Sequence, residues 1–151
     1  PLDIKERFNT VESIDIYPTA NIFCTSLNDP LAQQDSVTFL DIRQRPIAVL
    51  NSKLPVDWPL QIRLCTNTSS LIREAVSKGI LCALLPQDFV RDWDDVAVLP
   101  FNPPQNCAVK AVWNKNLPHS SALQEFVDFL LEYFAAQGIV LPEEKIEDDE
   151  I

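Results

Sequence analysis

The strongest constraint on the fold of this chain is the order of three segments within residues 61–85. Residues 61–65 are expected to form a strand, and residues 69–78 a helix that leads into a second strand at Ile80–Leu85. The second strand is apolar throughout and does not alternate, which indicates a strand covered on both faces. A strand, a helix and a strand of this length predict a parallel crossover. The chain is therefore expected to fold around an open α/β sheet with Ile80–Leu85 at its centre.

The predicted helix has a start signal, an apolar face and a stop signal. Asn67 or Thr68 can cap its first turn by accepting a hydrogen bond from a free backbone N–H. Gly79 follows the last turn, where a residue in the left-handed conformation commonly ends a helix. The apolar side chains expected to face the sheet are those of Leu71, Ile72, Ala75 and Val76.

Further elements are expected on both sides of this block. Residues 1–18 are polar and irregular, with Pro18 closing them, and the prolines at 55 and 59 mark a loop. A final amphipathic helix is expected to begin at a capping box of Ser121 and Gln124 and to end at Gly138. The other predicted elements are a turn or short helix within Gln33–Arg43, a short helix from Gln87 to Trp93, and strands at Ala20–Ser26, Pro46–Leu50, Val96–Leu99 and Ala108–Trp113.

Scarce residue types exclude several classes of site. The chain has two glycines, whereas the Walker loop and the dinucleotide fingerprint each need several glycines close together. His119 is the only histidine, and the cysteines at positions 24, 65, 82 and 107 lack the short paired spacing of a zinc site. We therefore expect no metal site and no other cofactor.

Cysteine placement and hydropathy indicate the compartment. The four cysteines lie in apolar, strand-like runs, which is typical of reduced core thiols and of a cytoplasmic protein. No apolar run approaches the ~20 residues that a membrane-spanning helix needs, and the chain does not open with a signal region. We therefore expect no membrane as a partner.

The charge is acidic and unevenly spread. Twelve basic and 22 acidic residues give a net charge of −10, and residues 143–151, with six acids and one lysine, account for −5 of it. Because no basic face is available to neutralise phosphates, binding of nucleic acid by this chain alone is disfavoured. Residues 138–151 are expected to form an acidic, disordered tail.

Four motifs occur in an order that is known from one family. The segment "FCTSLNDPLA" at Phe23–Ala32 is similar to a strand leading into an "HPLA" turn, with Asp29 where histidine is usual. The segments "VTFLDIRQRPIAVL" and "LIREAVSKGILCALLP" are similar to "L.DL...P.I.L" and "LV..G.G.ALLP", with Leu81 replacing the second glycine. The segment "AVWNKNLPHSSALQEFVDFLLEY" is similar to a closing strand and helix. Residues 11–137 thereby resemble the effector-binding domain of LysR-type transcriptional regulators.

The resemblance implies a fold and a set of partners. The fold would be a Rossmann-like open mixed sheet with flanking helices, of the periplasmic-binding-protein-like type II kind, over residues 1–137. The first half of the family's first lobe has no counterpart here, and residues 51–60 suffice only for a loop where the family has a helix. The implied partners are a small, often anionic effector, a second copy of the chain in a homodimer, and DNA through a winged helix-turn-helix that this chain does not contain. We interpret the chain, which opens on Pro1 and has no methionine, as a piece of a longer polypeptide.

Four residues form the candidate effector site. Thr66, Asn67 and Thr68 lie in a hydroxyl-rich turn at the carboxyl end of a predicted parallel strand, where open α/β sheets bind ligands. The N-terminus of the following helix offers free N–H donors and a positive dipole end to an anion. By the motif match, Ser26 is expected on the hinge side of the same cleft. The alternative is that Asn67 or Thr68 only caps its helix and that Ser26 only ends its strand.

Two rival functions remain open. A solute-binding lobe of a transport system has the same two-lobed plan, but it would act outside the cytoplasm, where four cysteines tend to oxidise. A small α/β thiol enzyme would need an exposed thiolate of low pKa at one of the four cysteines. Catalysis by His119 with Ser120 or Ser121 is disfavoured, because no acid orients the histidine and the serines begin a helix. We therefore expect no catalytic residue, and a ligand sensor is the leading hypothesis.

Overall fold

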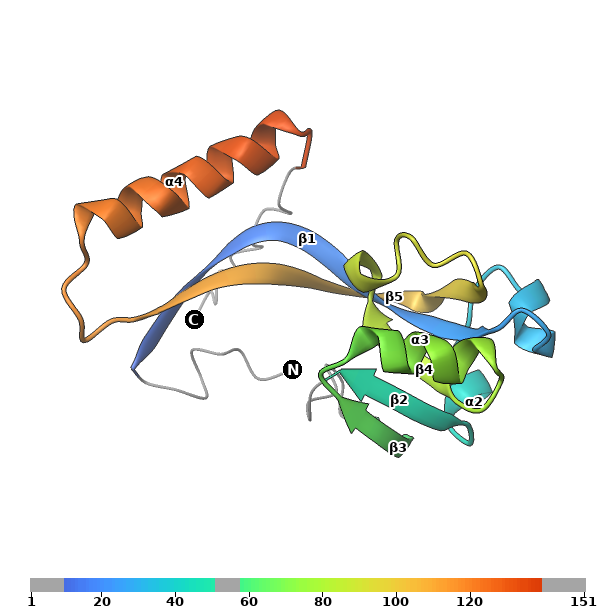
Figure 1. The fold of residues 1–151 in the computed structure, drawn as a ribbon. Coiled ribbons are helices and arrows are strands. Elements are labelled where there is room, and N and C mark those ends of the chain that lie inside the picture. Colours follow the sequence, from blue (N-terminus) through green and yellow to red (C-terminus); the bar gives the residue numbers. More distant parts are fainter. Residues whose placement is uncertain (1–9, 51–57, 140–151) are drawn as a thin grey trace, which may run out of the picture. The chain divides into compact units, whose positions relative to one another are not determined.

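The computed structural model describes residues 10–50 and 58–139, which form a five-stranded sheet with accompanying helices (Figure 1). Pro55 and the predicted acidic tail beyond Ile139 lie outside the described residues. The strands are β1 (Val11–Ser26), β2 (Pro46–Leu50), β3 (Gln61–Thr66), β4 (Cys82–Pro86) and β5 (Val96–Asn114). The helices are α2 (Phe39–Ile42), α3 (Ser69–Ser77) and α4 (Ser121–Ala136), with 3-10 turns η1 (Pro30–Gln33) and η2 (Gln87–Phe89).

The sheet is mixed, as the sequence predicts. Its strand order is β3-β2-β4-β1-β5. Strand β2 is parallel to both β3 and β4, and β1 is antiparallel to β4. The connection from β3 through α3 to β4 therefore passes over β2, which confirms the predicted parallel crossover. Because β4 has a neighbour on each side, the central position of the apolar run is confirmed from Cys82 on, whereas Ile80 precedes the strand and is 63% exposed.

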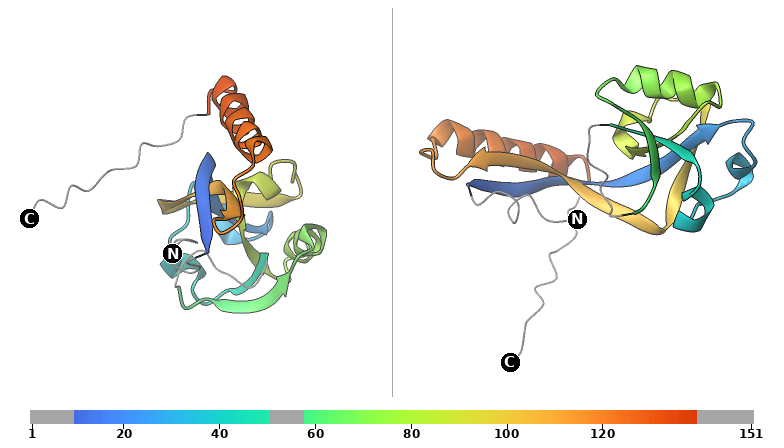
Figure 2. Two further views of the ribbon diagram at one scale, coloured as in Figure 1. Left: turned by 90° about the vertical axis from the view of Figure 1, so that its left-hand side faces the viewer. Right: turned by 90° about the horizontal axis from the view of Figure 1, so that it is seen from below.

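The two faces of the sheet are covered by different elements. Helix α3 lies across one face, where Ile72 and Val76 are fully buried (Figure 2). Ile42 of α2 is fully buried in the core of the other face. Leu71, which was expected to face the sheet, is 47% exposed, so that part of the prediction is wrong. A stripe of two fully buried residues one turn apart is enough to hold a nine-residue helix on the sheet.

Strand β1 is much longer than the sequence predicts. It begins at Val11, whereas residues 1–18 were expected to be irregular, and Pro18 lies inside the strand. Strand β4 pairs only with residues from Asn21 to Cys24, so β1 has no such partner at Pro18. A proline, which lacks an N–H, is tolerated where a strand is unpaired on one side. Pro18 therefore did not mark the boundary between irregular chain and strand that the sequence analysis expected.

Strand β5 is one continuous strand, whereas two strands were predicted. It runs from Val96 to Asn114 and includes Pro100, Pro103 and Pro104, which lie between the two predicted strands. Because β5 is the last strand in the sheet order, its outer side meets only an isolated bridge between Val37 and Phe101, and prolines are tolerated along such an edge.

The helix ends agree with the sequence in part. Gly79 and Gly138 have φ values of +69° and +76°, which confirms that both end their helices in the left-handed conformation. Thr68 is the residue that caps α3 by position, but neither its side chain nor that of Asn67 makes a capping hydrogen bond. The predicted capping box of α4 is also displaced. Ser120, not Ser121, accepts a hydrogen bond from the Leu123 N–H, at 3.2 Å.

The chain divides into two compact units. The first contains Thr19–Cys107 and holds β2, β3, β4 and α3. The second contains the described residues up to Pro18 and from Ala108 on, and includes α4. Within the second unit, the rings of Tyr17 and Phe134 are 4.8 Å apart. No helix among the described residues is both long enough and apolar enough to cross a membrane.

Candidate functional site

The carboxyl ends of β3 and β4 lie on the same side of the first unit, because both strands are parallel to β2. We call this side the carboxyl end of the sheet. Val49 of β2 pairs with Cys65 of β3 and with Leu84 of β4, so the segments that follow these two residues leave the sheet at the same level. Open α/β sheets bind ligands at this end, where loops and helix N-termini converge. The fold therefore places the Thr66–Thr68 turn where the sequence predicts.

The Thr66–Thr68 turn is open to a ligand. Asn67 and Thr68 are exposed, and Thr66 is half-buried. The Thr66 hydroxyl accepts a hydrogen bond from the Thr68 N–H at 3.1 Å, which fixes the shape of the turn. Because no side chain caps α3, the N–H groups of its first turn are left for solvent or for a ligand. The turn can therefore offer amide and hydroxyl donors to a small polar molecule.

Ser26 lies at the opposite end of the sheet, so the prediction that it shares a cleft with Thr66 is wrong in its geometry. Strand β1 is antiparallel to β4, and Cys24 pairs with Ala83 near the beginning of β4. Ser26 therefore lies beside Gly79, where an added Cβ would be 3.7 Å from the Ser26 Cβ. Gly79 follows the C-terminus of α3, about 13 Å along a nine-residue helix from its N-terminus. The Ser26 hydroxyl accepts a hydrogen bond from the Asn28 N–H at 3.3 Å, which supports the reading that it ends its strand.

A polar cluster at the carboxyl end of the sheet was not predicted. Asp88 follows β4, and its carboxylate accepts a hydrogen bond of 2.5 Å from the hydroxyl of Thr19 on β1. On the other side of β1, Asn21 donates to the sulfur of Cys107 on β5 at 3.7 Å. Thr19 and Asn21 are buried polar residues, at 6% and 7% exposure. Nothing in the sequence identified these contacts, since they depend on how β1 lies against its two neighbours, β4 and β5.

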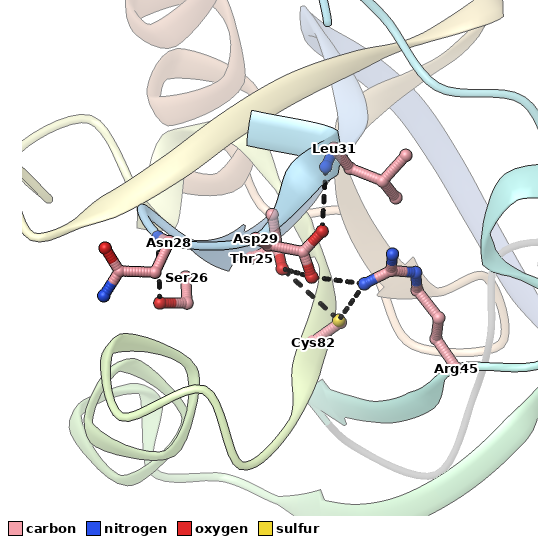
Figure 3. Close-up of polar contacts among 7 residues, drawn as sticks. All are labelled: Thr25, Ser26, Asn28, Asp29, Leu31, Arg45 and Cys82. Carbon is pink, nitrogen blue, oxygen red and sulfur yellow. Dashed lines mark hydrogen bonds and ion pairs between the residues drawn. The ribbon is translucent and has the colours of Figure 1, made fainter. Parts of the chain in front are cut away.

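A second polar cluster lies at the amino end of the sheet (Figure 3). There the Asp29 carboxylate pairs with the Arg45 guanidinium and accepts hydrogen bonds from the Thr25 hydroxyl and the Leu31 N–H, at 2.9 and 2.8 Å. Burial favours the neutral carboxyl, but these hydrogen bonds and the charge of Arg45 outweigh it and hold the pKa of Asp29 below its ordinary value. The Asp29 carboxylate thus ties η1, β1 and Arg45 together, which holds η1 in place.

The cysteines give little support for thiol chemistry. Burial, together with the neighbouring Cys82, raises the pKa of Cys24 to about 12. Burial and the nearby Asp88 carboxylate also raise the pKa of Cys107. Cys82 is buried, and Cys65, on β3, is the exposed member of the four. A reactive thiol needs both exposure and a lowered pKa. Cys24 and Cys107 have raised pKa values, and Cys82 is buried, so these three cysteines do not meet both conditions.

The His119 region shows no catalytic geometry. Ser120 caps α4, and the His119 ring packs edge-on against Trp113 with ring centroids 5.5 Å apart. The His119 Nε2 atom contacts the Gln124 side chain at 3.1 Å, and neither Ser120 nor Ser121 is its hydrogen-bond partner. Among residues 10–50 and 58–139, no three His, Cys, Asp or Glu side chains converge as metal ligands would.

Comparisons with known proteins agree with the geometry of the first unit. The family model of the LysR substrate binding domain matches residues 4–135. The effector binding domain of QuiR in complex with shikimate is 20% identical, with a TM-score of 0.72, and the match covers 89% of this chain and 70% of QuiR's. A variant of the regulatory domain of MetR from Neisseria meningitidis is 16% identical, with a TM-score of 0.68, and the match covers 91% of this chain and 72% of the other.

Comparison with a longer regulator shows how much of that protein this chain spans. HinK, a LysR family transcriptional regulator from Pseudomonas aeruginosa, is 18% identical, with a TM-score of 0.66. The match covers 83% of this chain but only 49% of HinK, so the chain spans about half the length of that regulator. No curated protein matches the chain closely enough to count as a relative.

Proposed function

Because the chain belongs to the family of LysR substrate binding domains, we propose that it is the effector-sensing and dimer-forming part of a LysR-type transcription regulator. The observation that supports this most strongly is the family match over residues 4–135, to which the mixed sheet and its parallel crossover conform. DNA would be bound by a winged helix-turn-helix outside these residues. The regulator would act in the cytoplasm as a homodimer, and the domain would catalyse no reaction.

The proposed effector site is the Thr66–Thr68 turn at the carboxyl end of the sheet. Two features support it: the turn is exposed, and the first turn of α3 has N–H groups without a side-chain cap. A helix N-terminus has a positive partial charge of roughly half a unit, which favours a carboxylate or another anion. Ser26 is not part of this proposal because it lies at the amino end of the sheet. The domain boundary at residue 137 is proposed together with the site.

Such a domain would act by shifting a population. An effector that binds one conformation of the regulator better than another moves the equilibrium toward the first by its difference in affinity. A coupling free energy of about 1–3 kcal/mol is typical and is enough to change the occupancy of a DNA site.

The proposal is tested by thermal unfolding of the 151-residue chain in the presence of a panel of small carboxylates. Shikimate, which QuiR binds, is the first probe. We expect at least one carboxylate to raise the Tm of the wild-type chain, and Thr66→Ala and Asn67→Ala to remove that increase. Thr66→Ser retains the hydroxyl and is the matched control, which should keep the increase. Equal ligand-induced shifts in the wild type and in both alanine variants would contradict the proposed site.

A further inference from the structure

We propose that a brace of side-chain contacts fixes β1 and β5 where they leave the first unit, and that it limits the freedom of the second unit relative to the first. The brace consists of the hydrogen bond from Thr19 to Asp88 and the contact between Asn21 and Cys107. The inference goes beyond the proposed function, because it concerns the conformations of the chain itself and does not depend on where an effector binds.

Among the described residues, β1 and β5 are the segments that continue from one unit into the other. The division falls between Pro18 and Thr19 in β1, and between Cys107 and Ala108 in β5. The two strands are neighbours in the sheet. A ribbon of two strands is only marginally stable by itself, so side-chain contacts decide how firmly it is held. Contacts at the boundary therefore influence how far one unit can move against the other.

The pairing of β1 with β4 ends just before this boundary. Asn21 pairs with Pro86, which is the last residue of β4 and has no N–H to donate. Thr19 lies two residues nearer the boundary, and its hydroxyl donates to the Asp88 carboxylate at 2.5 Å. This hydrogen bond therefore extends the attachment of β1 from the end of the ladder to the first residue of the Thr19–Cys107 stretch.

The second contact attaches β1 to its other neighbour. Strand β1 lies between β4 and β5 in the sheet order. The side-chain amide of Asn21 donates to the sulfur of Cys107, the last residue of the first unit in β5, at 3.7 Å. Thr19 and Asn21 are two residues apart on one strand, so they share a face, and both are buried. At the boundary β1 is thus held from both sides.

The two contacts differ in strength. The hydrogen bond from Thr19 is charge-assisted, and the Asp88 side chain that accepts it is only 23% exposed. The sulfur of Cys107 is a weak acceptor. Arg91 also pairs with Asp88, but its side chain is 77% exposed, and such ion pairs contribute little. Most of the strength of the brace therefore comes from Thr19 and Asp88, which act as positioning residues.

A separate contact joins the same two strands within the second unit. There Lys110 of β5 forms an ion pair with Asp15 of β1 at 2.5 Å. This pair does not involve any residue of the brace. Loss of the brace should therefore loosen residues 16–20 and 106–109, whereas the strands stay joined beyond them.

The first test measures amide hydrogen exchange by mass spectrometry in the full 151-residue chain. In Thr19→Val, the amides of residues 16–20 and 106–109 should exchange about tenfold faster relative to those of β2. Thr19→Ser retains the hydroxyl and should behave like the wild type. Thr25→Val is the matched control, because Thr25 is also a buried threonine of β1 that donates to a carboxylate, that of Asp29 at 2.9 Å. It lies at the amino end of the sheet and should leave the relative exchange at the boundary unchanged.

The second test measures the freedom of the units directly. One spin label is attached to the exposed Cys65 of the first unit, and the other to a cysteine introduced by Glu125→Cys on α4 in the second unit. Pulsed electron resonance then gives the distribution of distances between the labels. Thr19→Val should broaden this distribution, whereas Thr19→Ser and Thr25→Val should not. A contact that only adds stability would not produce this difference between the two threonines.

Further variants keep the test decisive if Thr19→Val does not fold. Asp88→Ala removes the acceptor and should reproduce the faster exchange and the broader distribution. Cys107→Ala removes the weaker contact and should change both in the same direction by a smaller amount.

Three results would overturn the inference. The first is a folded Thr19→Val or Asp88→Ala variant with unchanged boundary exchange and an unchanged distance distribution. The second is an equal change in Thr25→Val, which would assign the effect to stability alone. The third is a failure of Thr19→Ser to keep the wild-type behaviour. None of these results bears on the proposed effector site, which is tested separately by the stabilisation that carboxylates induce.

Discussion

Thr19 and Asp88 lie opposite each other at the carboxyl end of the sheet, and the Thr19 hydroxyl donates a 2.5 Å hydrogen bond to the Asp88 carboxylate. Thr19 belongs to β1 and Asp88 to η2, so the bond joins the antiparallel strand to the segment that leaves β4. Thr19 is also the residue at which the Thr19–Cys107 stretch of the first unit begins. One polar contact thus fixes β1 to the segment that follows β4.

Replacing Thr19 by valine should lower the free energy of unfolding by about 1–2 kcal/mol. Valine has nearly the same shape, so the loss reflects the hydrogen bond to a partly buried charge rather than a cavity. Urea denaturation followed by circular dichroism measures the change. Thr68→Val is the control, because the exposed Thr68 side chain makes no capping hydrogen bond, and its cost should be a few tenths of a kcal/mol. Equal costs for the two variants would contradict the assigned role of Thr19.

The ion pair between Asp29 and Arg45 should make stability depend on acidic pH. The pKa of Asp29 is held below its ordinary value of 3.8, so the unfolded chain binds a proton at this carboxylate more readily than the folded chain does. Its stabilising contribution is therefore fully present above that ordinary value and is lost as the pH falls through the folded-state pKa. Denaturation curves at pH 6 and pH 3 should show a smaller loss of stability for Asp29→Asn than for the wild type.

Asp35→Asn is the matched control for this pH dependence. Asp35 is exposed and is not part of the Asp29 cluster. The Asp35→Asn variant should lose stability between pH 6 and pH 3 as the wild type does. If it behaves like Asp29→Asn, the ion pair is not the source of the effect.

Much of the first unit could be predicted from the sequence because its signals are local. The apolar run Ile80–Leu85 identified a central strand, and Gly79 identified the end of a helix; both are properties of a few neighbouring residues. Pro18 gave the wrong boundary for β1, and the stretch between the two strands predicted at Val96–Leu99 and Ala108–Trp113 proved to be part of one strand, β5. Whether a proline breaks a strand depends on which neighbours that strand has, and Pro18 and Pro103 do not reveal this locally.

The candidate site could be predicted only where it lies on one continuous segment. Thr66, Asn67 and Thr68 follow one strand and precede one helix, so their common position was visible in the sequence. Ser26 was placed at the wrong end of the sheet because the direction of β1 relative to β4 cannot be read from either strand alone. The contact between Thr19 and Asp88 was missed for the same reason, since 69 residues separate the two.

The left-handed conformation of Gly79 should make this position sensitive to side chains. Gly79→Ala should cost about 1 kcal/mol, because a residue with a Cβ is strained at a φ of +69°. The new Cβ would meet Ser26 at 3.7 Å, an ordinary contact, so the cost comes from the backbone and not from a clash. Gly79→Asn should cost less, because asparagine adopts this conformation more readily. Thermal unfolding of the two variants measures the order, and a larger cost for asparagine would contradict the explanation.

The four cysteines should react with a thiol reagent in an order set by exposure and pKa. Cys65 is exposed and should react first, whereas Cys24 is buried and its pKa of about 12 keeps it in the unreactive thiol form at pH 8. Reaction of the native chain with an aromatic disulfide at pH 8 should show one fast thiol and three slower ones. Cys65→Ser should remove the fast phase, and Cys24→Ser should leave it unchanged. A fast phase that survives Cys65→Ser would reveal a reactive thiol elsewhere and revive the thiol-enzyme hypothesis.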